Sequence, residues 1–224
     1  MKRAKQLLLD NIMWIIMLGM IVVFFVVAMQ PRKQEVPALG IVDMSSPMAR
    51  GVKNAKVNLV QYSDFMCPYC SYFSTSVMPK IDKAYIATKQ IAFEFRPVAF
   101  VANGSQETAE GAYCAIDQNK FWQYHDAVYQ HVWDTAFSKG VDPRTTTVLT
   151  VEGLKEVVAA KVELNASEFN SCLDTKKYEA KVKQVTAKAQ ADGVTGTPYI
   201  LVNGEPVRGT PTFEVINGLI KAGL

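Results

Sequence analysis

The sequence predicts an α/β domain with a helical insertion, preceded by one apolar N-terminal segment. Three patterns predict this class. Apolar residues alternate at 57–62 and again at 91–95, and a helical pattern lies between the two runs. A block of helical periodicity without any strand pattern then extends from about residue 103 to residue 192. Strand and turn patterns return at 199–208, and a last helix is expected at 212–221.

The first 30 residues are predicted to form a single transmembrane helix. Ile12 to Met29 is an uninterrupted apolar run of 18 residues. As a helix it would span about 27 Å, close to the thickness of a hydrocarbon core, and Leu7–Leu9 can extend it. A cleaved signal peptide has a shorter apolar region and a small-x-small site, of which Val26-Val27-Ala28 is a poor version. We therefore expect an uncleaved anchor that contacts the lipid bilayer through residues 7–29.

The charge of the chain is concentrated at its N-terminus. Of the formal net charge of +3, residues 1–37 carry five basic and two acidic side chains, and the remaining 187 residues carry 19 of each. A neutral body argues against a nucleic-acid partner. The basic residues before the apolar run favour a cytoplasmic N-terminus, which places the body on the extracytoplasmic, periplasmic side of the inner membrane. Cysteines can form disulfides there.

The rest of the chain is expected to form a linker and one domain. Residues 31–55 are polar and rich in proline and glycine, which predicts a linker with a short strand around Ile41-Val42. The domain then covers residues 56–224. Its first strand and the strand at 91–95 should pair in parallel, because the connection between them is a single helix. Pro79 lies inside that helix and predicts a kink near Met78. The insertion is expected to hold helices at 106–118, 121–133, 152–162, 167–173 and 176–192.

The junction between the first strand and its helix carries the motif Cys67-Pro68-Tyr69-Cys70. Proline suits the first turn of a helix, so Cys67 should stand at a helix N-terminus, where free N–H groups stabilise a thiolate. Cys70 begins a buried stripe and should be sheltered. An exposed acidic thiol beside a sheltered one predicts thiol–disulfide exchange, although a structural disulfide is an alternative. Met66 and Tyr69 flank the reactive thiol and could form an apolar contact patch.

The two remaining cysteines, Cys114 and Cys172, are 58 positions apart in the insertion. A zinc site would need a second Cys-X-X-Cys or a histidine pair, so we expect no metal. A structural disulfide between Cys114 and Cys172 is the favoured interpretation, and free buried thiols are the alternative.

Four stretches together resemble the DsbA-like thiol–disulfide oxidoreductases of the thioredoxin superfamily, and in particular their membrane-anchored bacterial branch. They stand in the order found in that family and extend from about residue 55 to the end of the chain. These stretches are Ser-Asp-Phe-Met-Cys-Pro-Tyr-Cys at 63–70, Lys-Phe-Trp-Gln-Tyr-His-Asp-Ala at 120–127, Cys-Leu-Asp at 172–174 and Gly-Val-Thr-Gly-Thr-Pro at 193–198.

The resemblance implies a thioredoxin-like fold with a helical insertion, and it implies roles for single residues. Cys67 would be the nucleophile and Cys70 the resolving cysteine. Pro198 would be a cis proline that, with Thr197, holds the substrate backbone. The family often has a buried glutamate six residues before the first cysteine, where this chain has Gln61, which cannot titrate.

Proton transfer is therefore expected to pass through water or through Asp64. From its sequence position, Asp64 should cap the exposed start of the helix.

The resemblance also implies a function. We expect an enzyme that introduces disulfides into cysteine-containing extracytoplasmic proteins, uses no cofactor and is returned to its active state by a membrane redox partner. A disulfide reductase or isomerase of the same fold is an alternative. A non-enzymatic anchored chaperone or metal-handling module is another.

Overall fold

The computed structural model describes residue 14, residues 17–21 and residues 39–224 of the chain. Its contacts divide the chain into two compact units, Met1–Glu35 and Val36–Leu224. The expected anchor at residues 7–29 lies for the most part outside the described residues. Within the part that is described, no helix combines the length and the apolarity that a membrane crossing needs. The second unit is described below by itself.

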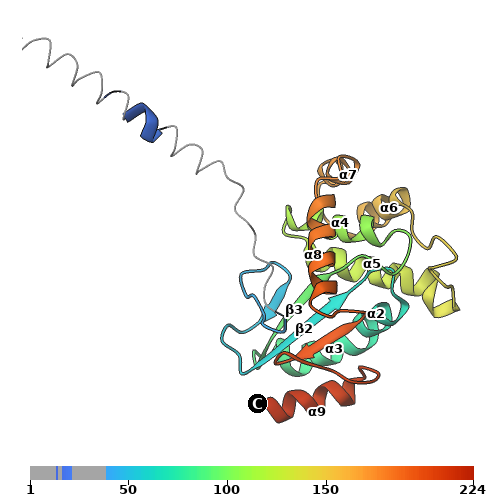
Figure 1. The fold of residues 1–224 in the computed structure, drawn as a ribbon. Helices are drawn as coiled ribbons and strands as arrows, with labels where there is room; N and C mark the ends of the chain where they lie inside the picture. The colour runs from blue at the N-terminus through green and yellow to red at the C-terminus, as the bar shows by residue number, and fades with distance from the viewer. Residues whose placement is uncertain (1–13, 15–16, 22–38) are drawn as a thin grey trace, which may run out of the picture. The chain divides into compact units, whose positions relative to one another are not determined.

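A mixed five-stranded sheet lies at the centre of this unit (Figure 1). Its strands are β1 (Ala49–Gly51), β2 (Val57–Ser63), β3 (Ile91–Pro97), β4 (Tyr199–Val202) and β5 (Glu205–Pro206). Their order across the sheet is β1-β3-β2-β4-β5. β2 pairs in parallel with β3 and antiparallel with β4, and β4 pairs antiparallel with β5. The predicted parallel unit and the predicted hairpin are both confirmed.

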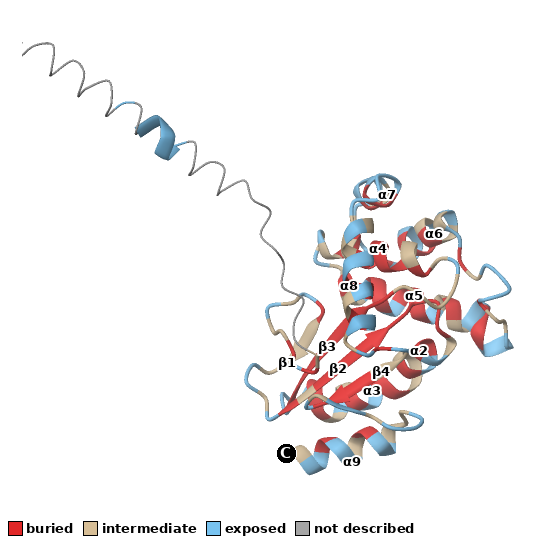
Figure 2. Ribbon diagram, in the orientation of Figure 1, coloured by how far each residue is buried: buried red, intermediate tan, exposed pale blue. Residues whose placement is uncertain are grey.

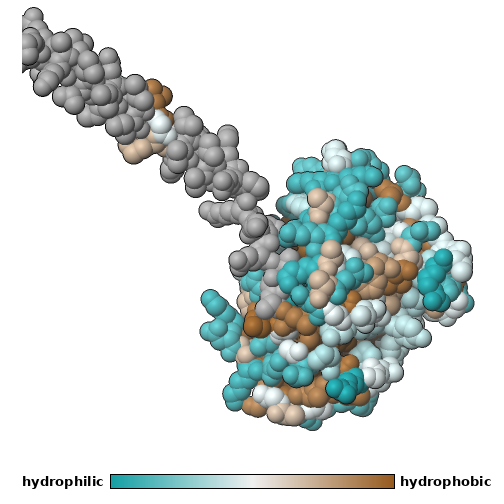
Figure 3. Space-filling model, in the orientation of Figure 1, coloured by the Kyte–Doolittle hydropathy of each residue, from teal (hydrophilic) through white to brown (hydrophobic). Residues whose placement is uncertain are grey.

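The helices follow the order expected from the sequence. They are α2 (Pro68–Tyr72), α3 (Met78–Ile81), α4 (Ser105–Ile116), α5 (Phe121–Thr135), α6 (Val151–Lys161), α7 (Ala166–Asp174), α8 (Glu179–Ala191) and α9 (Phe213–Gly223), with a 3-10 turn η3 (Phe137–Lys139) after α5. Helices α4 to α8 form the insertion between β3 and β4. Figure 3 shows hydrophilic residues over the part of the displayed face where Figure 1 places α7 and α8.

The helical segment after β2 changes its winding twice. α2 is followed by a π-helical turn, η1 (Phe73–Val77), and α3 is followed by another, η2 (Asp82–Ile86). Pro79 has no N–H to give to the turn before it, and the N–H of Met78 bonds to the carbonyl of Phe73, five residues back. The disturbance predicted near Met78 is therefore present as a π turn. The apolar stripe that begins at Cys70 is buried along the whole segment.

The two faces of β2, the central strand of the sheet, contact different layers of the domain. Leu59 faces a cluster that includes residues of α2, α3, α5 and α9. Val60 and Tyr62 face the other cluster, which includes Ala189 of α8. Because side chains alternate along a strand, Gln61 and Ser63 lie on the same face as Leu59, toward α2 and α5. Figure 2 shows that β2 and β3 are buried along almost all of their length.

The segment before β2 differs from its prediction. The first strand is Ala49–Gly51, paired antiparallel with β3, and Ile41-Val42 is not a strand. Residues 41–43 are instead held by side chains of β3, since Arg96 donates to the carbonyl of Ile41 and Glu94 accepts from the N–H of Asp43 at 2.9 Å. These contacts come from positions far along the chain and leave no local pattern. Residues 39–55 belong to the compact unit, so the expected linker ends before Ala55.

Candidate active site

Cys67 stands at the point where the central strand gives way to a helix. Its backbone is extended, with φ −94° and ψ 120°, and Pro68 occupies the first turn of α2. The N–H of Ser71 bonds to the carbonyl of Cys67 at 3.0 Å, which starts the helix. Cys67 is only 4% exposed and Cys70 is fully buried, whereas Tyr69 between them is 74% exposed. The expectation of an exposed Cys67 was therefore wrong, and Met66, also buried, contributes no contact surface.

The turn before β4 covers Cys67. The Thr197–Pro198 peptide bond is cis. The Sγ of Cys67 donates a hydrogen bond to the carbonyl oxygen of Thr197 at 3.3 Å, across 130 positions of sequence. The side-chain oxygen of Thr197 is also buried and interacts with the thiols of Cys67 and Cys70. The structure thus brings together Cys67, Cys70 and the Thr197–Pro198 turn.

The two thiols differ in acidity. Both are free in the structure. A hydrogen bond from the Cys70 thiol, with a smaller contribution from the Thr197 side chain, outweighs burial and lowers the pKa of Cys67 to about 7. Burial, followed by the hydrogen bond to Cys67, raises the pKa of Cys70 well above that of a free thiol. Cys67 is therefore partly ionised at neutral pH, and Cys70 holds its proton. The position of Cys67 at a helix N-terminus favours the same ionisation.

Asp64 is completely buried, which corrects the expectation of an exposed helix cap. Its Oδ1 accepts from the N–H of Met66 and from the hydroxyl of Ser105, both at 2.8 Å. Its Oδ2 accepts from the N–H groups of Phe100 at 2.9 Å and Val101 at 3.0 Å. Burial raises the pKa of this carboxyl against the opposing effect of its four donors. Asp64 thus ties the loop before Cys67 to the loop after β3.

Gln61 lies in a buried polar cluster with Ser63 and Tyr129. Of these three residues, only Gln61 was predicted to belong to the site. Its Nε2 donates to the hydroxyl of Ser63 at 3.0 Å, and that hydroxyl lies 2.8 Å from the hydroxyl of Tyr129 in α5. Ser63 also interacts with the thiol of Cys70 and lowers its pKa. The sequence could have indicated Ser63, because Gln61 and Ser63 are two polar residues on the same face of a buried strand. No local sequence pattern indicates their contact with Tyr129, which is 66 positions from Ser63.

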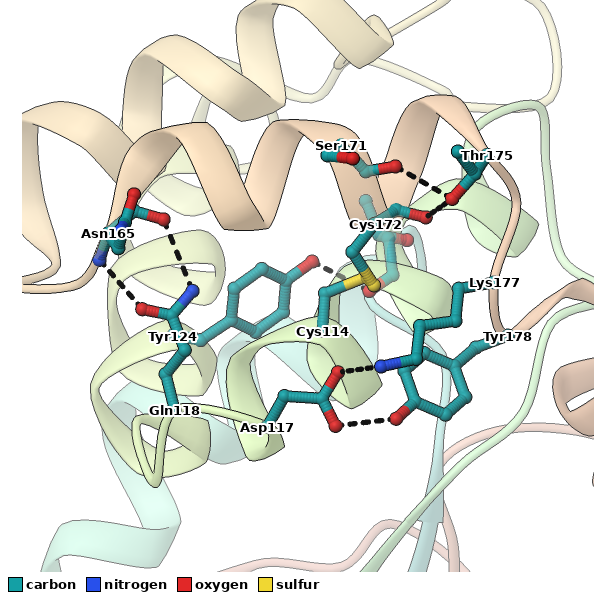
Figure 4. The surroundings of a disulfide bond; sticks show 11 residues. Cys114, Asp117, Gln118, Tyr124, Asn165, Ser171, Cys172, Thr175, Lys177 and Tyr178 are labelled. Carbon is teal, nitrogen blue, oxygen red and sulfur yellow. Dashed lines mark hydrogen bonds and ion pairs between the residues drawn. A yellow bond between two sulfur atoms is a disulfide. The ribbon is translucent and has the colours of Figure 1, made fainter.

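The other two cysteines form a disulfide between α4 and α7 (Figure 4). The Cys114 and Cys172 Cα atoms are 5.9 Å apart. Polar contacts join the same region, since Asp117 accepts from Lys177 at 2.8 Å and from Tyr178 at 2.6 Å. The disulfide is a cross-link inside the insertion and is separate from the Cys67–Cys70 pair.

Comparison with known proteins agrees with this architecture. A family model described as thioredoxin matches residues 43–222. The chain is 28% identical over 183 residues to the "Probable disulfide bond formation protein D" of Bacillus anthracis. The matched residues make up 80% of this chain and 79% of that protein.

Two solved structures have the same fold. The crystal structure of oxidised BdbD from Bacillus subtilis matches with a TM-score of 0.68 at 21% identity, over 84% of this chain and 98% of that one. The crystal structure of Chlamydia trachomatis DsbA matches with a TM-score of 0.67 at 20% identity, over 86% and 96%. Because the family model spans most of the sequence, the chain belongs to the thioredoxin family, and its fold is DsbA-like, with helices α4 to α8 inserted before the cis-proline turn.

Proposed function

We propose that the protein is a thiol–disulfide oxidoreductase that acts through Cys67 and Cys70 and introduces disulfides into cysteine-containing proteins. The observation that carries this proposal is the difference between the two thiols. Cys67 has a pKa lowered to about 7, and Cys70, beside it, has a pKa raised well above that of a free thiol. A nucleophile that is ionised at neutral pH and a protonated partner are what stepwise exchange requires.

In the oxidising direction the Cys67–Cys70 pair starts as a disulfide. A substrate thiolate attacks the sulfur of Cys67, and the Cys67–Cys70 bond breaks with its electron pair on Cys70. A second substrate thiolate then attacks the substrate sulfur of the mixed disulfide, and Cys67 leaves as a thiolate. The substrate has gained one disulfide, and the enzyme has gained two electrons. The carbonyl of Thr197 lies 3.3 Å from the Cys67 sulfur, which supports a role for the cis-proline turn in holding the substrate backbone beside this sulfur.

The direction of exchange is proposed from the relatives rather than from acidity. Nucleophilic thiols of Cys-X-X-Cys motifs have pKa values from about 3.5 to about 7.5. The value of about 7 for Cys67 is at the upper part of that range and permits attack in either direction. The relative from Bacillus anthracis is named for disulfide bond formation. We take oxidation as the direction on this basis, and reduction or isomerisation as the alternative.

The cellular setting is part of the same proposal. Residues 7–29 anchor the chain in the inner membrane, and the domain faces the extracytoplasmic side. A membrane redox partner or a small oxidant removes the two electrons and restores the Cys67–Cys70 disulfide. The long apolar run and the basic residues before it support this arrangement.

The reduction potential of the Cys67–Cys70 pair tests the direction. It is measured by equilibrating the full-length protein, in detergent, with glutathione redox buffers and quantifying free thiols by mass. An oxidase should lie in the range of about −200 to −120 mV, where oxidising members of this fold are found. A potential at or below about −270 mV, that of thioredoxin, would reject oxidation in favour of reduction.

A further inference from the structure

A buried hydroxyl, that of Ser63, belongs to a polar cluster that also involves Cys70, the proposed resolving cysteine. Ser63 is the last residue of β2, and Tyr129 lies on the facing side of α5. Ser63 and Gln61 are fully buried and Tyr129 is almost so. The Ser63 hydroxyl lies 3.0 Å from the Nε2 of Gln61 and 2.8 Å from the hydroxyl of Tyr129. It also interacts with the thiol of Cys70, and this interaction acts to lower the pKa of that thiol.

The number of hydrogen bonds that the Ser63 hydroxyl can make limits which group can accept its proton. A hydroxyl has one proton and two lone pairs. Gln61 can only donate through Nε2, which occupies one lone pair. When Tyr129 donates to Ser63, the second lone pair is occupied as well. The proton of Ser63 is then left for its remaining neighbour, the sulfur of Cys70.

A second arrangement uses the same heavy atoms. The hydroxyl of Tyr129 also lies 3.3 Å from the backbone carbonyl oxygen of Asp64. When Tyr129 donates there, Ser63 can donate to the oxygen of Tyr129, and the Cys70 thiol keeps its own proton. Rotation of two hydroxyl protons interconverts the arrangements without movement of any side chain. A negative charge on Cys70 favours the arrangement in which Ser63 donates to sulfur.

We propose that Ser63 is a catalytic residue that donates a hydrogen bond to the Cys70 thiolate as it leaves the disulfide, and that Tyr129 positions Ser63 for this role. The inference rests on the proposed thiol–disulfide exchange. In the step concerned, the substrate thiolate forms a bond to the Cys67 sulfur, and the bond between Cys67 and Cys70 breaks. The electron pair stays on Cys70. Ser63 keeps its proton, so no acid or base is consumed.

The chemistry of the site explains why such a donor is needed. Complete burial makes the Cys70 thiolate a poor leaving group, because leaving slows as the leaving thiol becomes less acidic. Gln61 is neutral and cannot supply a proton. The pKa of Tyr129 is raised by burial well above that of a free phenol, so Tyr129 also stays neutral. A neutral hydroxyl held by two donors is the group that these residues place against the sulfur.

The experiment compares Ser63→Ala and Tyr129→Phe with a matched control. Tyr124→Phe removes another buried hydroxyl from α5, one that donates to the carbonyl of Thr108 at 2.6 Å, and its ring packs on Phe65 as the ring of Tyr129 does. The full-length oxidised protein is mixed with excess reduced glutathione, and the single-turnover loss of the Cys67–Cys70 disulfide is followed by acid quench and mass.

Ser63→Ala should slow this step roughly tenfold, the size expected from losing one hydrogen bond to a charged group. Tyr129→Phe should slow it less. The double variant should be no slower than Ser63→Ala alone, because both changes act through one hydroxyl. Tyr124→Phe should react at the wild-type rate. Alkylation of reduced Cys67 by iodoacetamide should be unchanged in all of these variants, since Ser63 contacts Cys70, whereas a distorted site would alter both reactions.

A wild-type rate in Ser63→Ala, additive effects of the two changes, or equal slowing in Tyr124→Phe would each overturn the role of Ser63. If Ser63→Ala does not fold, Tyr129→Phe decides the question, and a wild-type rate in it refutes the inference. If the wild-type protein itself does not exchange with glutathione, the proposed function fails, which is a different result.

Discussion

The four cysteines of the domain form two pairs that differ in sequence separation, in whether the sulfurs are bonded and in the residues around them. Cys67 and Cys70 lie within one helical turn and are free thiols. Cys114 and Cys172 lie on two helices, 58 positions apart, and are joined. The first pair is covered by a turn that comes from the other end of the domain, with the Thr197 carbonyl 3.3 Å from a sulfur. The surroundings of the second pair include the ion pair between Lys177 and Asp117 and the ring of Tyr124 (Figure 4).

The difference teaches that surroundings, rather than the presence of two cysteines, decide between exchange and cross-linking. Neighbours of the first pair move the two pKa values in opposite directions. The second pair closes a long loop, and such a cross-link chiefly restricts the unfolded chain. One pair should therefore govern the rate of exchange, and the other should govern stability.

The largest expected effect is the loss of exchange in Cys67→Ser. A serine hydroxyl at this position is not ionised at neutral pH and cannot attack a disulfide, so turnover of a dithiol peptide should fall to background. The matched control is Cys114→Ala/Cys172→Ala, which should exchange at the wild-type rate. Exchange that persists in Cys67→Ser, or that disappears in the control, would reverse the assignment of the two pairs.

In a stability measurement the order of the two variants should be reversed, with the larger effect in Cys114→Ala/Cys172→Ala. Removing the Cys114–Cys172 disulfide should lower the free energy of unfolding by about 4 kcal/mol, because it frees a loop of this length in the unfolded chain. Urea denaturation followed by circular dichroism gives the value. Cys67→Ser should retain most of the stability. A double alanine variant as stable as the wild-type protein would show that the cross-link does not constrain the chain.

A smaller loss is expected for Asp64→Asn. An amide nitrogen in place of either carboxylate oxygen would face donors from Met66 and Ser105 or from Phe100 and Val101. Leaving a buried N–H without an acceptor should cost about 2 kcal/mol.

Asp142→Asn, at an exposed carboxylate that binds Arg144, is the control and should stay within about 0.5 kcal/mol of the wild type. Denaturation of both variants checks this difference. If Asp64→Asn keeps its stability but loses exchange, Asp64 is a proton carrier rather than a structural tie.

The smallest expected effect is a shift in the pH profile of Cys67. The rate of alkylation of the reduced protein by iodoacetamide should rise with pH around a midpoint of about 7 and level off at higher pH, because only the thiolate reacts. The pKa lies below the free-thiol value of 9.0 because neighbours stabilise the thiolate.

Thr197→Val keeps the shape of the side chain and removes its hydroxyl, so the midpoint should move upward, toward the value of a free thiol. An unchanged midpoint would remove Thr197 from the causes, and a wild-type midpoint near 9 would remove the acidic nucleophile.

Local sequence patterns were sufficient for most of the fold. Periodicity placed β2, β3, the insertion helices and the β4–β5 hairpin within a few residues, since each of these elements is set by its own apolar stripe. The strand-to-helix junction at Cys67 followed from a proline that suits a first helical turn.

Predictions failed where a contact comes from far along the chain. Asp64 was expected at the surface, but three of the four groups that donate to its carboxylate lie 36 to 41 positions away. Cys67 was expected to be exposed, but a turn 130 positions away covers it. The pairing of Ser63 with Tyr129 depends on how α5 packs on the sheet, which no local pattern specifies.

The most direct test of the account is to trap the exchange intermediate. The Cys70→Ser variant, reduced and then mixed with oxidised glutathione, cannot resolve a mixed disulfide at Cys67. Mass spectrometry of the digested protein should find glutathione on Cys67 and on no other cysteine. Glutathione on Cys114 or Cys172 with Cys67 left free, or no adduct on any cysteine, would contradict the central claim that Cys67 is the nucleophile.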